Sequence, residues 1–298
     1  MLKNSPVIFG IEGLMLNSQE IEFFKKIKPY GFILFSRNID NPEQVKALTA
    51  HLKDITGFDC PVLIDQEGGR VARLRPPHWK EYPPMSKFAN IAQNDLDKAI
   101  AEVFLNYQNI GKDLYELGIN VNCAPVCDLI FEGAHDIVGD RSFGSDVDIV
   151  SALARGAAEG LLSSKVTPII KHIPGHGRAK ADSHKELPKV ECSKDDLFKN
   201  DFKIFKNLCD MPWAMTAHIL YSDIDPDNPA TLSKKIIDII RNDIGFSGVL
   251  VTDDLSMEAL TGSYAIRTKK ALDAGCDIIL HCNGNLDQMQ QIASIFVD

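Results

Sequence analysis

The stretch GVLVTDD, residues 248–254, indicates the fold class, because it is a short apolar run that ends in two acids. A run without strict polar alternation is typical of a parallel β-strand that is covered by helices on one side and packed on the other. Residues two apart on a strand point to one face, so Val249, Val251 and Asp253 share a face. With the valines inside a barrel, the carboxylate of Asp253 points into its mouth.

Similar runs recur from end to end and alternate with amphipathic helical patterns. The eight candidate strands are PVIFGIEG (6–13), GFILFS (31–36), PVLIDQ (61–66), NVNCAPV (120–126), TPIIKH (167–172), PWAMTAHI (212–219), GVLVTDD (248–254) and CDIILHC (276–282). Eight strand–helix pairs in 298 residues fit a closed parallel barrel. The alternative is an open doubly wound sheet, but no glycine-rich dinucleotide turn follows the first strand. We therefore predict an α/β protein with one catalytic domain over residues 1–298, a (β/α)₈ or TIM barrel.

Several helices can be placed from local signals. Asn41 is a cap residue, Pro42 takes the first helical position, and Gln44 is placed to complete a capping box. Apolar residues at helical spacing predict further helices around residues 100–114 and 236–240. A last helix is expected over about residues 286–297.

Charge and cysteine content restrict the function class. The 32 basic and 41 acidic side chains give a net charge of −9, without the clustered basic face that nucleic-acid binding needs. The seven cysteines are scattered through apolar runs without Cys-x-x-Cys spacing, as expected for buried thiols in a reducing compartment. MLKNSPVIFG at the N-terminus lacks the features of a signal peptide, and no apolar run is long enough to cross a bilayer. We expect a cytoplasmic protein that needs no cofactor and no metal.

Polar side chains stand where several predicted strands end. They are Asp65, Lys171, His172, His218, Asp253 and Asp254. Barrel enzymes build their active sites at this end of the strands. A lysine that ends an apolar strand must find polar partners or water. For Asp253 the competing interpretation is a helix-capping acid, a role that suits Asp254 better.

The long loop KHIPGHGRAKADSHKELP, residues 171–188, carries a second cluster. Residues two apart in an extended segment project to the same side, so Asp182 is placed to accept a hydrogen bond from one ring nitrogen of His184. That bond would set the tautomer and leave the other nitrogen free for proton transfer. An Asp-x-His triplet alone is a weak signal, and its position over the same rim as Asp253 strengthens it.

KHIPGHG (171–177) followed by ADSH (181–184), together with GFSGVLVTDDLSM (245–257), resembles the signature pair of family 3 glycoside hydrolases. Within that family the chain is most similar to the single-domain bacterial β-N-acetylhexosaminidases of the NagZ type. Further matching stretches are GFILFSRN (31–38), LIDQEGGRVARL (63–74), GINVNCAPVCDL (118–129), DRSFG (140–144), MTAHI (215–219), PATLS (229–233) and ALDAGCDIIL (271–280). The resemblance therefore spans nearly the whole chain, in order. One departure is His281, which occupies a usually apolar position.

The resemblance implies a role for each matching residue. Asp253 falls on the family's nucleophile, and His184, assisted by Asp182, falls on its proton-transferring histidine. The residues that fall on sugar-holding positions are Asp65, Arg73, Arg141, Lys171 and His172. Surface ion pairs are the competing interpretation for the two arginines. His176 is expected to shape the loop, and His218 to support the site through hydrogen bonds.

The implied reaction is a retaining double displacement that releases a terminal β-1,4-linked N-acetylglucosamine from cytoplasmic peptidoglycan fragments, the anhydro-muropeptides. The only expected partner of this monomer is that carbohydrate, and neither nucleic acid nor membrane is expected to bind. Three alternatives stay open: another sugar specificity or phosphorolysis within the family, a sugar-binding module without activity, and a metal-dependent barrel hydrolase. The last would recruit His172, His176, His184 and His218 as ligands.

Overall fold

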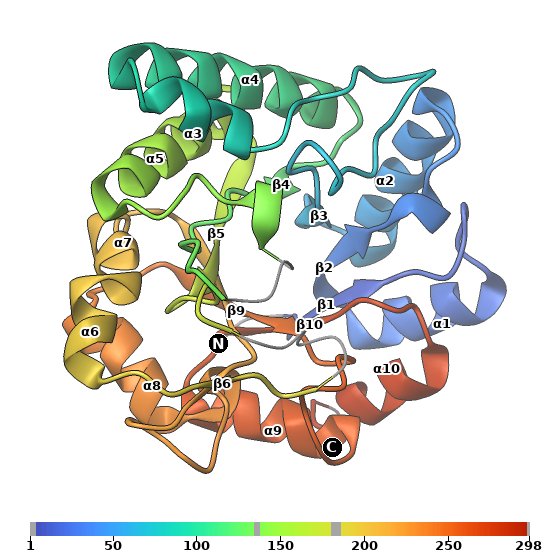
Figure 1. Ribbon diagram of the computed structural model, residues 1–298. Coiled ribbons are helices and arrows are strands. Elements are labelled where there is room, and N and C mark those ends of the chain that lie inside the picture. The colour runs from blue at the N-terminus through green and yellow to red at the C-terminus, as the bar shows by residue number, and fades with distance from the viewer. Residues whose placement is uncertain (1–3, 134–137, 180–185, 297–298) are drawn as a thin grey trace.

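The computed structural model describes residues 4–133, 138–179 and 186–296. Its centre is a closed barrel of parallel strands in the order β1-β10-β9-β7-β5-β4-β3-β2 (Figure 1). The barrel strands are β1 (Ser5–Gly10), β2 (Pro29–Leu34), β3 (Val62–Ile64), β4 (Val121–Asn122), β5 (Thr167–Ile173), β7 (Trp213–Thr216), β9 (Val249–Asp254) and β10 (Ile278–His281). Each predicted run overlaps one of these strands, so the predicted single-domain TIM barrel is confirmed and the open sheet is excluded.

Helices surround the barrel on its outside (Figure 1). The α-helices are α1 (Ser18–Ile27), α2 (Pro42–Thr56), α3 (Ser86–Ala92), α4 (Leu96–Glu116), α5 (Val147–Ser163), α6 (Lys194–Lys199), α7 (Asp201–Asn207), α8 (Lys234–Asp238), α9 (Tyr264–Ala274) and α10 (Leu286–Ala293). Shorter helical turns are η1 (Ser36–Asn38), η2 (Gly139–Arg141), η3 (Ala230–Leu232) and the π-helical η4 (Ile239–Asp243). A small parallel pair, β6 (Lys189–Val190) with β8 (Leu220–Tyr221), was not expected, because two-residue strands leave no pattern in a sequence.

Helix α2 begins as predicted, with one difference. The side chain of Asn41 accepts a hydrogen bond from the backbone N–H of Gln44 at 3.0 Å, and Pro42 occupies the first turn. The side chain of Gln44 reaches back to the backbone N–H of Asp40 instead of that of Asn41. The return hydrogen bond of the capping box thus falls on the residue before the predicted one. The amide nitrogen of the Gln44 side chain also donates to the carbonyls of Leu14 and Asn38.

The apolar core has two parts, inside the barrel and between the barrel and its helices. The inner part consists of Ile8, Ile33, Leu63, Val121, Cys123, Ile169, Trp213, Met215, Val251, Ile278, Leu280 and Cys282. Val251 belongs to this inner part and Val249 packs against it, so strand β9 has the orientation that its alternation predicts. The inner part forms the floor on which the polar strand ends stand.

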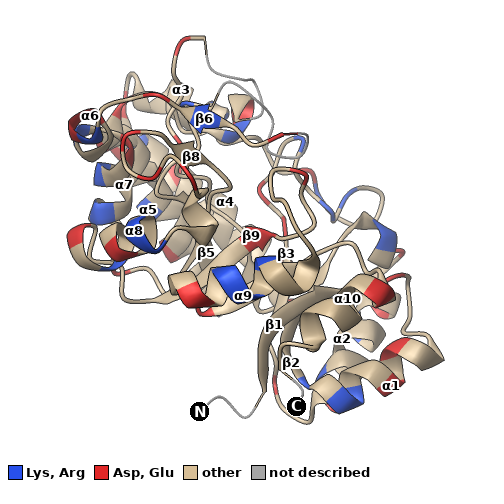
Figure 2. Cartoon of the chain, turned by 90° about the horizontal axis from the view of Figure 1, so that it is seen from below, with Lys and Arg blue, Asp and Glu red and all other residues tan. Residues whose placement is uncertain are grey.

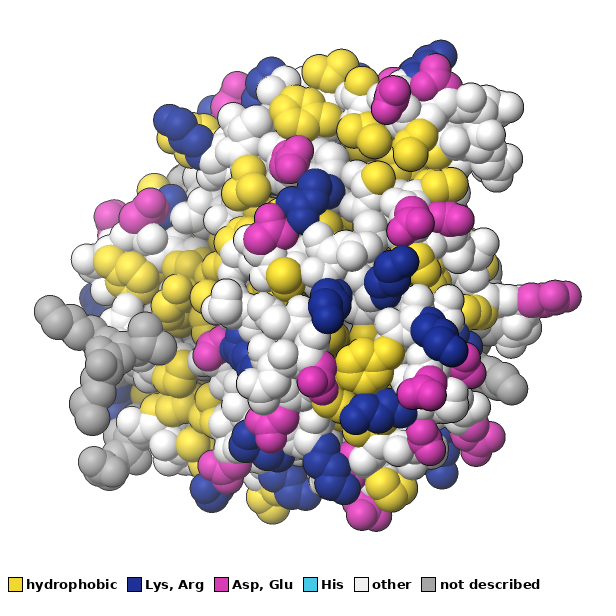
Figure 3. All heavy atoms as spheres, turned by 90° about the vertical axis from the view of Figure 1, so that its left-hand side faces the viewer, with side chains coloured by type: hydrophobic (Ala, Val, Ile, Leu, Met, Phe, Trp, Pro, Cys, Tyr) yellow, Lys and Arg dark blue, Asp and Glu magenta, His cyan; other side chains and the backbone are white. Residues whose placement is uncertain are grey.

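Charged side chains of both signs are spread over the outside of the described chain. Figure 2 shows lysines, arginines and acids distributed over most helices, and Figure 3 shows one face on which basic and acidic groups are interspersed. No described helix combines the length and apolar character that a membrane span requires. All seven cysteines are free thiols.

Candidate active site

One cavity of about 570 Å³ opens at the carboxyl ends of the barrel strands. Six of the eight residues predicted to act in catalysis or sugar binding line it, namely Asp65, Arg73, Arg141, Lys171, His172 and Asp253. Its floor contains inner-core side chains such as Ile33, Met215 and Leu280. Asp182 and His184, predicted for proton transfer, lie outside the residues that the structure describes.

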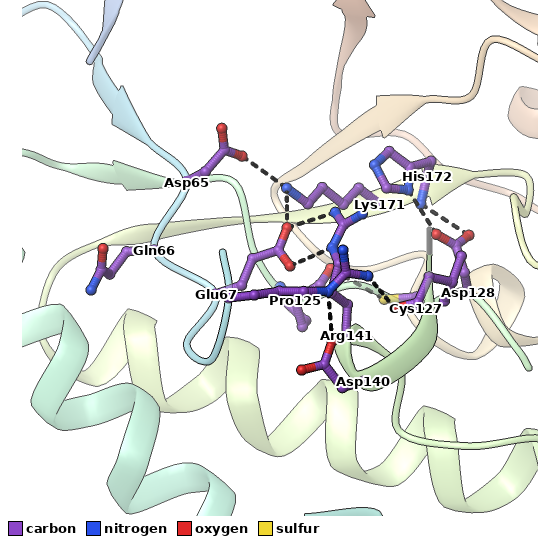
Figure 4. Close-up of polar contacts among 12 residues, drawn as sticks. Asp65, Gln66, Glu67, Pro125, Cys127, Asp128, Asp140, Arg141, Lys171 and His172 are labelled. Atoms are coloured by element: carbon purple, nitrogen blue, oxygen red, sulfur yellow. Dashed lines mark hydrogen bonds and ion pairs between the residues drawn. The ribbon is translucent and has the colours of Figure 1, made fainter. Parts of the chain in front are cut away.

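Lys171, on β5, is the centre of a buried ionic network (Figure 4). Its Nζ lies 2.9 Å from Oδ1 of Asp65, directly after β3, and 2.7 Å from Oε1 of Glu67. Burial would raise the pKa of Asp65, but the charges of Lys171 and Arg73 and their hydrogen bonds hold it well below its usual range. The expectation that this lysine must find polar partners is thus confirmed, and its ammonium faces the cavity in charged form.

Glu67 is a site residue that the sequence interpretation missed. Arg141, which ends η2, grips its carboxylate in a fork, with Nε–Oε2 and Nη2–Oε1 distances of 2.8 Å each. The backbone carbonyl of Glu67 accepts a hydrogen bond from the hydroxyl of Tyr107 at 2.8 Å. Burial opposes ionisation, yet the charges of Lys171 and Arg141 lower the pKa of Glu67 to about 2. The sequence does carry a signal for Glu67, which stands two residues after Asp65. In an extended segment, residues two apart project to the same side, so Glu67 and Asp65 share a side.

The two predicted arginines face the cavity and do not form surface ion pairs. Nη2 of Arg73 lies 3.2 Å from Oδ2 of Asp65, and its guanidinium stands 5.2 Å from the centroid of the Phe35 ring. The side chain of Arg141 is only 13 % exposed. Arg73 and Arg141 thus hold the two carboxylates that flank Lys171, which leaves a wall of ordered charges along one side of the cavity.

His172 is held by a second missed residue, Asp128, which follows β4 (Figure 4). Nδ1 of His172 lies 2.7 Å from Oδ2 of Asp128. Oδ1 of the same carboxylate accepts the backbone N–H of His176 at 2.7 Å. Burial and the neighbouring His172 lower the pKa of His176 to about 4, so its ring is neutral near pH 7. The hydrogen bond to Asp128 thus fixes the backbone of His176 where the loop after β5 begins.

Asp253 lies on β9 and lines the cavity opposite this network. Its Oδ1 accepts the backbone N–H of Asp254 at 2.8 Å, and its own N–H donates to Oγ1 of Thr216 at 3.3 Å. Burial would raise the pKa of Asp253, but His218, His172, the Asp254 N–H and Lys171 together lower it. The carboxylate is therefore ionised near neutral pH, which a nucleophile requires.

Asp254 has a structural role. Its carboxylate accepts the backbone N–H of Ser256 at 2.9 Å and that of Cys282 at 3.1 Å, and it also accepts the Ser256 hydroxyl at 2.6 Å. The expected capping role is thus exercised on the turn after β9 and not on a helix. His218 is buried and makes two hydrogen bonds, as expected for a supporting group.

The arrangement combines pre-paired cations and anions, which can bind several sugar hydroxyls, with one ionised carboxylate that has no counter-ion among the described side chains. Within the described ranges, no group of three or more His, Cys, Asp or Glu side chains is placed to hold a metal ion. Such a site suits the stabilisation of positive charge on a bound sugar.

Comparison with known proteins gives a consistent result. Residues 11–297 match the N-terminal domain of glycosyl hydrolase family 3. The chain is 36 % identical to a beta-hexosaminidase of Alkalilimnicola ehrlichii over 283 residues, or 93 % of this chain and 80 % of that protein. It is 35 % identical to a beta-hexosaminidase of Aromatoleum aromaticum over 93 % of this chain and 79 % of that protein.

Two solved structures extend the comparison to the fold. NagZ of Neisseria gonorrhoeae, in complex with N-trifluoroacetyl-D-glucosamine, superposes with a TM-score of 0.89 at 32 % identity, over 98 % of this chain and 89 % of that one. A family 3 beta-N-acetylglucosaminidase from a Paenibacillus species superposes with a TM-score of 0.91 at 30 % identity, and this chain spans 57 % of that chain. The chain therefore belongs to glycosyl hydrolase family 3, and it is a glycoside hydrolase of the NagZ-like beta-hexosaminidase group.

Proposed function

We propose that the protein is a retaining β-N-acetylglucosaminidase that releases terminal β-1,4-linked N-acetylglucosamine from anhydro-muropeptides. The observation that carries the proposal is the contrast between Asp253 and the other cavity carboxylates. Asp65 and Glu67 are each neutralised by two cations, and Asp254 accepts three hydrogen bonds. Among the described side chains, no cation lies within ion-pair distance of Asp253, which leaves Oδ2 available for attack on the sugar.

In the first step, an oxygen of Asp253 forms a bond to the anomeric carbon while the bond from that carbon to the leaving oxygen breaks. His184 transfers its proton to the leaving oxygen, assisted by Asp182. In the second step, neutral His184 removes a proton from water, the water oxygen bonds to the anomeric carbon, and the ester to Asp253 breaks. An imidazole suits both steps, since its ordinary pKa of about 6.5 allows proton exchange near neutral pH.

The described residues on both sides of Asp182 and His184 support the proposed placement of this pair. Before them, Nε of Arg178 lies 2.7 Å from Oδ2 of buried Asp201, and its guanidinium stands 4.0 Å from the centroid of the Phe131 ring. After them, Lys189 and Val190 pair with β8. These contacts anchor the loop, which leaves β5 at the cavity wall formed by Lys171 and His172.

We assign sugar recognition to Asp65, Arg73, Arg141, Lys171 and His172. Because Asp128 occupies Nδ1 of His172, Nε2 is the nitrogen that is left to accept a sugar hydroxyl. The amino sugar named in the Neisseria gonorrhoeae complex supports N-acetylglucosamine as the substrate unit. We further propose that residues 1–298 act as one catalytic domain, as a monomer in the cytoplasm, without cofactor or nucleic-acid partner.

The decisive experiment is covalent trapping. A 5-fluoro-N-acetylglucosaminyl fluoride should glycosylate the wild-type enzyme on Asp253 with loss of the anomeric fluoride, and mass spectrometry of the digested protein should detect the labelled peptide. Asp253→Asn should remove both labelling and turnover while N-acetylglucosamine still binds. Labelling of another residue, or substantial hydrolysis by Asp253→Asn, would contradict the assignment.

The substrate class is tested separately with matched substrates. The wild-type enzyme should hydrolyse aryl N-acetyl-β-glucosaminide in preference to the corresponding β-glucoside and β-xyloside. It should also prefer a disaccharide that ends in anhydro-muramic acid to chitobiose. A rate that depends on added phosphate would indicate phosphorolysis, and loss of activity after exhaustive chelation would favour the metal-dependent alternative.

A further inference from the structure

A connected set of buried hydroxyl and imidazole groups lies beside Asp253. It consists of Thr216, the last residue of β7, His218 two residues later, and Thr231 in η3, and each is 0 % exposed. Oγ1 of Thr216 lies 2.8 Å from Oγ1 of Thr231, which lies 2.7 Å from Nδ1 of His218. The set touches the backbone of β9 at two points. Oγ1 of Thr216 lies 3.3 Å from the Asp253 nitrogen, and Nε2 of His218 lies 3.0 Å from the Asp254 oxygen.

The directions of the hydrogen bonds in this set can be assigned from the Asp254 carbonyl and the His218 ring. The carbonyl of Asp254 can only accept, so Nε2 of His218 carries a hydrogen. Burial lowers the pKa of His218, so the ring is neutral and Nδ1 must accept. The single hydroxyl hydrogen of Thr231 has two acceptors within reach, Nδ1 of His218 at 2.7 Å and the carbonyl oxygen of Ala217 at 3.1 Å. Because Nδ1 of a neutral ring needs a donor and forms the shorter contact, we assign the hydrogen to Nδ1.

The remaining bonds are then determined. Because the hydrogen of Thr231 is used by His218, Oγ1 of Thr231 accepts from the hydroxyl of Thr216. Oγ1 of Thr216 in turn accepts the backbone N–H of Asp253. A one-way chain thus runs from the amide of Asp253 through Thr216, Thr231 and His218 to the carbonyl of Asp254.

The chain replaces strand pairing where the pairing stops. The last paired residues of β7 and β9 are Met215 and Val251, two positions before Asp253. On the other side of β9, Asp254 still pairs with Leu280 of β10. Without these side-chain hydrogen bonds, the tip of β9 would be held to β10 but not to β7. The backbone N–H of Asp253 would then have no acceptor on β7, and the peptide units around Asp253 would be less restrained.

We propose that Thr216, Thr231 and His218 are positioning residues that fix the backbone of Asp253 and thereby aim its carboxylate at the anomeric carbon. This inference rests on the proposed function, in which Asp253 is the nucleophile. The alternative is a buried polar network that only stabilises the fold. The two differ because a positioning role affects the formation of the covalent intermediate more than sugar binding or stability.

Thr216→Val keeps the shape of the side chain and removes the acceptor of the Asp253 amide. We expect the rate of glycosyl-enzyme formation, from pre-steady-state kinetics with an aryl substrate, to fall about 10- to 100-fold, as for a small misplacement of a reacting group. The Kd for N-acetylglucosamine should change by less than about twofold, because the sugar-holding residues are untouched. Thr216→Ser, which retains the hydroxyl, should restore most of the rate.

Thr252→Val is the matched control. Thr252 is also 0 % exposed, is adjacent to Asp253, and accepts a backbone N–H, that of Leu280 at 2.9 Å, but it points away from the barrel interior. Thr252→Val should lower the melting temperature about as much as Thr216→Val does. Its rate of glycosyl-enzyme formation should stay within about twofold of the wild-type rate. Equal rate losses in both valine variants, or no rescue by Thr216→Ser, would overturn the proposal.

A second measurement does not depend on activity or on the folding of Thr216→Val. In ¹⁵N-histidine-labelled wild-type protein, the signal that disappears in His218→Asn should report a neutral ring protonated at Nε2. A ring protonated at Nδ1, or at both nitrogens, at pH 7 would overturn the assigned direction. Failure of the proposed function would differ from either result, because trapping would then label a residue other than Asp253.

Discussion

Nδ1 of buried His172 lies 2.7 Å from Oδ2 of Asp128, and the other oxygen of that carboxylate accepts the backbone N–H of His176. One carboxylate therefore determines both the tautomer of a cavity histidine and the start of the loop that carries Asp182 and His184. Because an ionised carboxylate only accepts, Nδ1 must donate, and in the neutral ring Nε2 becomes the acceptor that faces a sugar hydroxyl.

Asp128→Asn should reverse this tautomer, since the new amide can donate to Nδ1. We expect kcat/KM for an aryl N-acetyl-β-glucosaminide to fall by at least about 10-fold, as wrong-tautomer variants of hydrolase histidines do. The measurement is steady-state kinetics of Asp128→Asn, His172→Ala and the double variant. If Asp128 acts through His172, the double variant will be little worse than His172→Ala, whereas additive losses would count against this relationship.

Glu67→Gln should weaken both substrate binding and the fold, because it removes the anion shared by Lys171 and Arg141. We expect a higher KM and a loss of about 3 to 5 kcal/mol of unfolding free energy, typical when one partner of a buried ion pair is removed. Glu20→Gln is the control, because Glu20 is equally buried but caps α1 and does not line the cavity. A changed KM in the control and not in Glu67→Gln would refute the role of Glu67.

The same residue predicts an acid dependence of stability. Glu67 has a pKa of about 2 in the folded protein, below the value of 4.5 expected for an unperturbed glutamate. Below 4.5 the unfolded chain binds the proton first, so the contribution of Glu67 is present above that pH and is lost as the pH falls from 4.5 towards 2. Chemical unfolding at several pH values should show that Glu67→Gln lacks this part of the acid dependence.

His184→Ala should reveal the role of the proposed proton donor through the leaving group. Natural disaccharides need a proton on the departing oxygen, so their hydrolysis should fall by about 100-fold or more. Nitrophenolate departs without protonation, so the first step with nitrophenyl glycosides should be much less affected. His51→Ala, at an exposed position of α2, should leave both rates unchanged. Equal losses with both leaving groups would exclude the acid role.

His281→Leu should stabilise the protein. The ring of His281 is 0 % exposed between Phe9 and Tyr264, and neither nitrogen forms a hydrogen bond within the described chain, although Asn283 lies beside it. Leucine would remove two unsatisfied polar atoms, a gain of about 1 to 3 kcal/mol. Burial lowers the pKa of His281, so the wild type loses stability as the pH falls below the ordinary histidine value. Thermal melts should show a larger difference between the proteins at pH 5.5 than at pH 8, and an equal difference would exclude this cause.

The fold was predictable because its signals are local. Each barrel strand is an apolar run that is legible within six to eight letters, and the polar residues that end these runs must lie at one rim in any parallel barrel. The sequence alone therefore places Asp65, Lys171 and Asp253 at one rim of the barrel. Roles for Arg73, Arg141 and His172 came from motif resemblance, and the structure places all three at the same cavity.

The partnerships inside the cavity depended on the tertiary structure. Lys171 meets Asp65 across 106 positions of sequence, and Arg141 meets Glu67 across 74. Each contact depends on the path of a loop and on side-chain rotamers, neither of which leaves a periodic signal in the chain. Glu67, Asp128, Thr216 and Thr231 lie in stretches that match the family, but the letters of a stretch do not name the partner of each side chain. These residues matter through what folding places beside them. Alternation of apolar and polar residues was thus enough to specify the barrel and its polar rim, whereas closure of the barrel decided which charge neutralises which, because ion pairs form between neighbours in space.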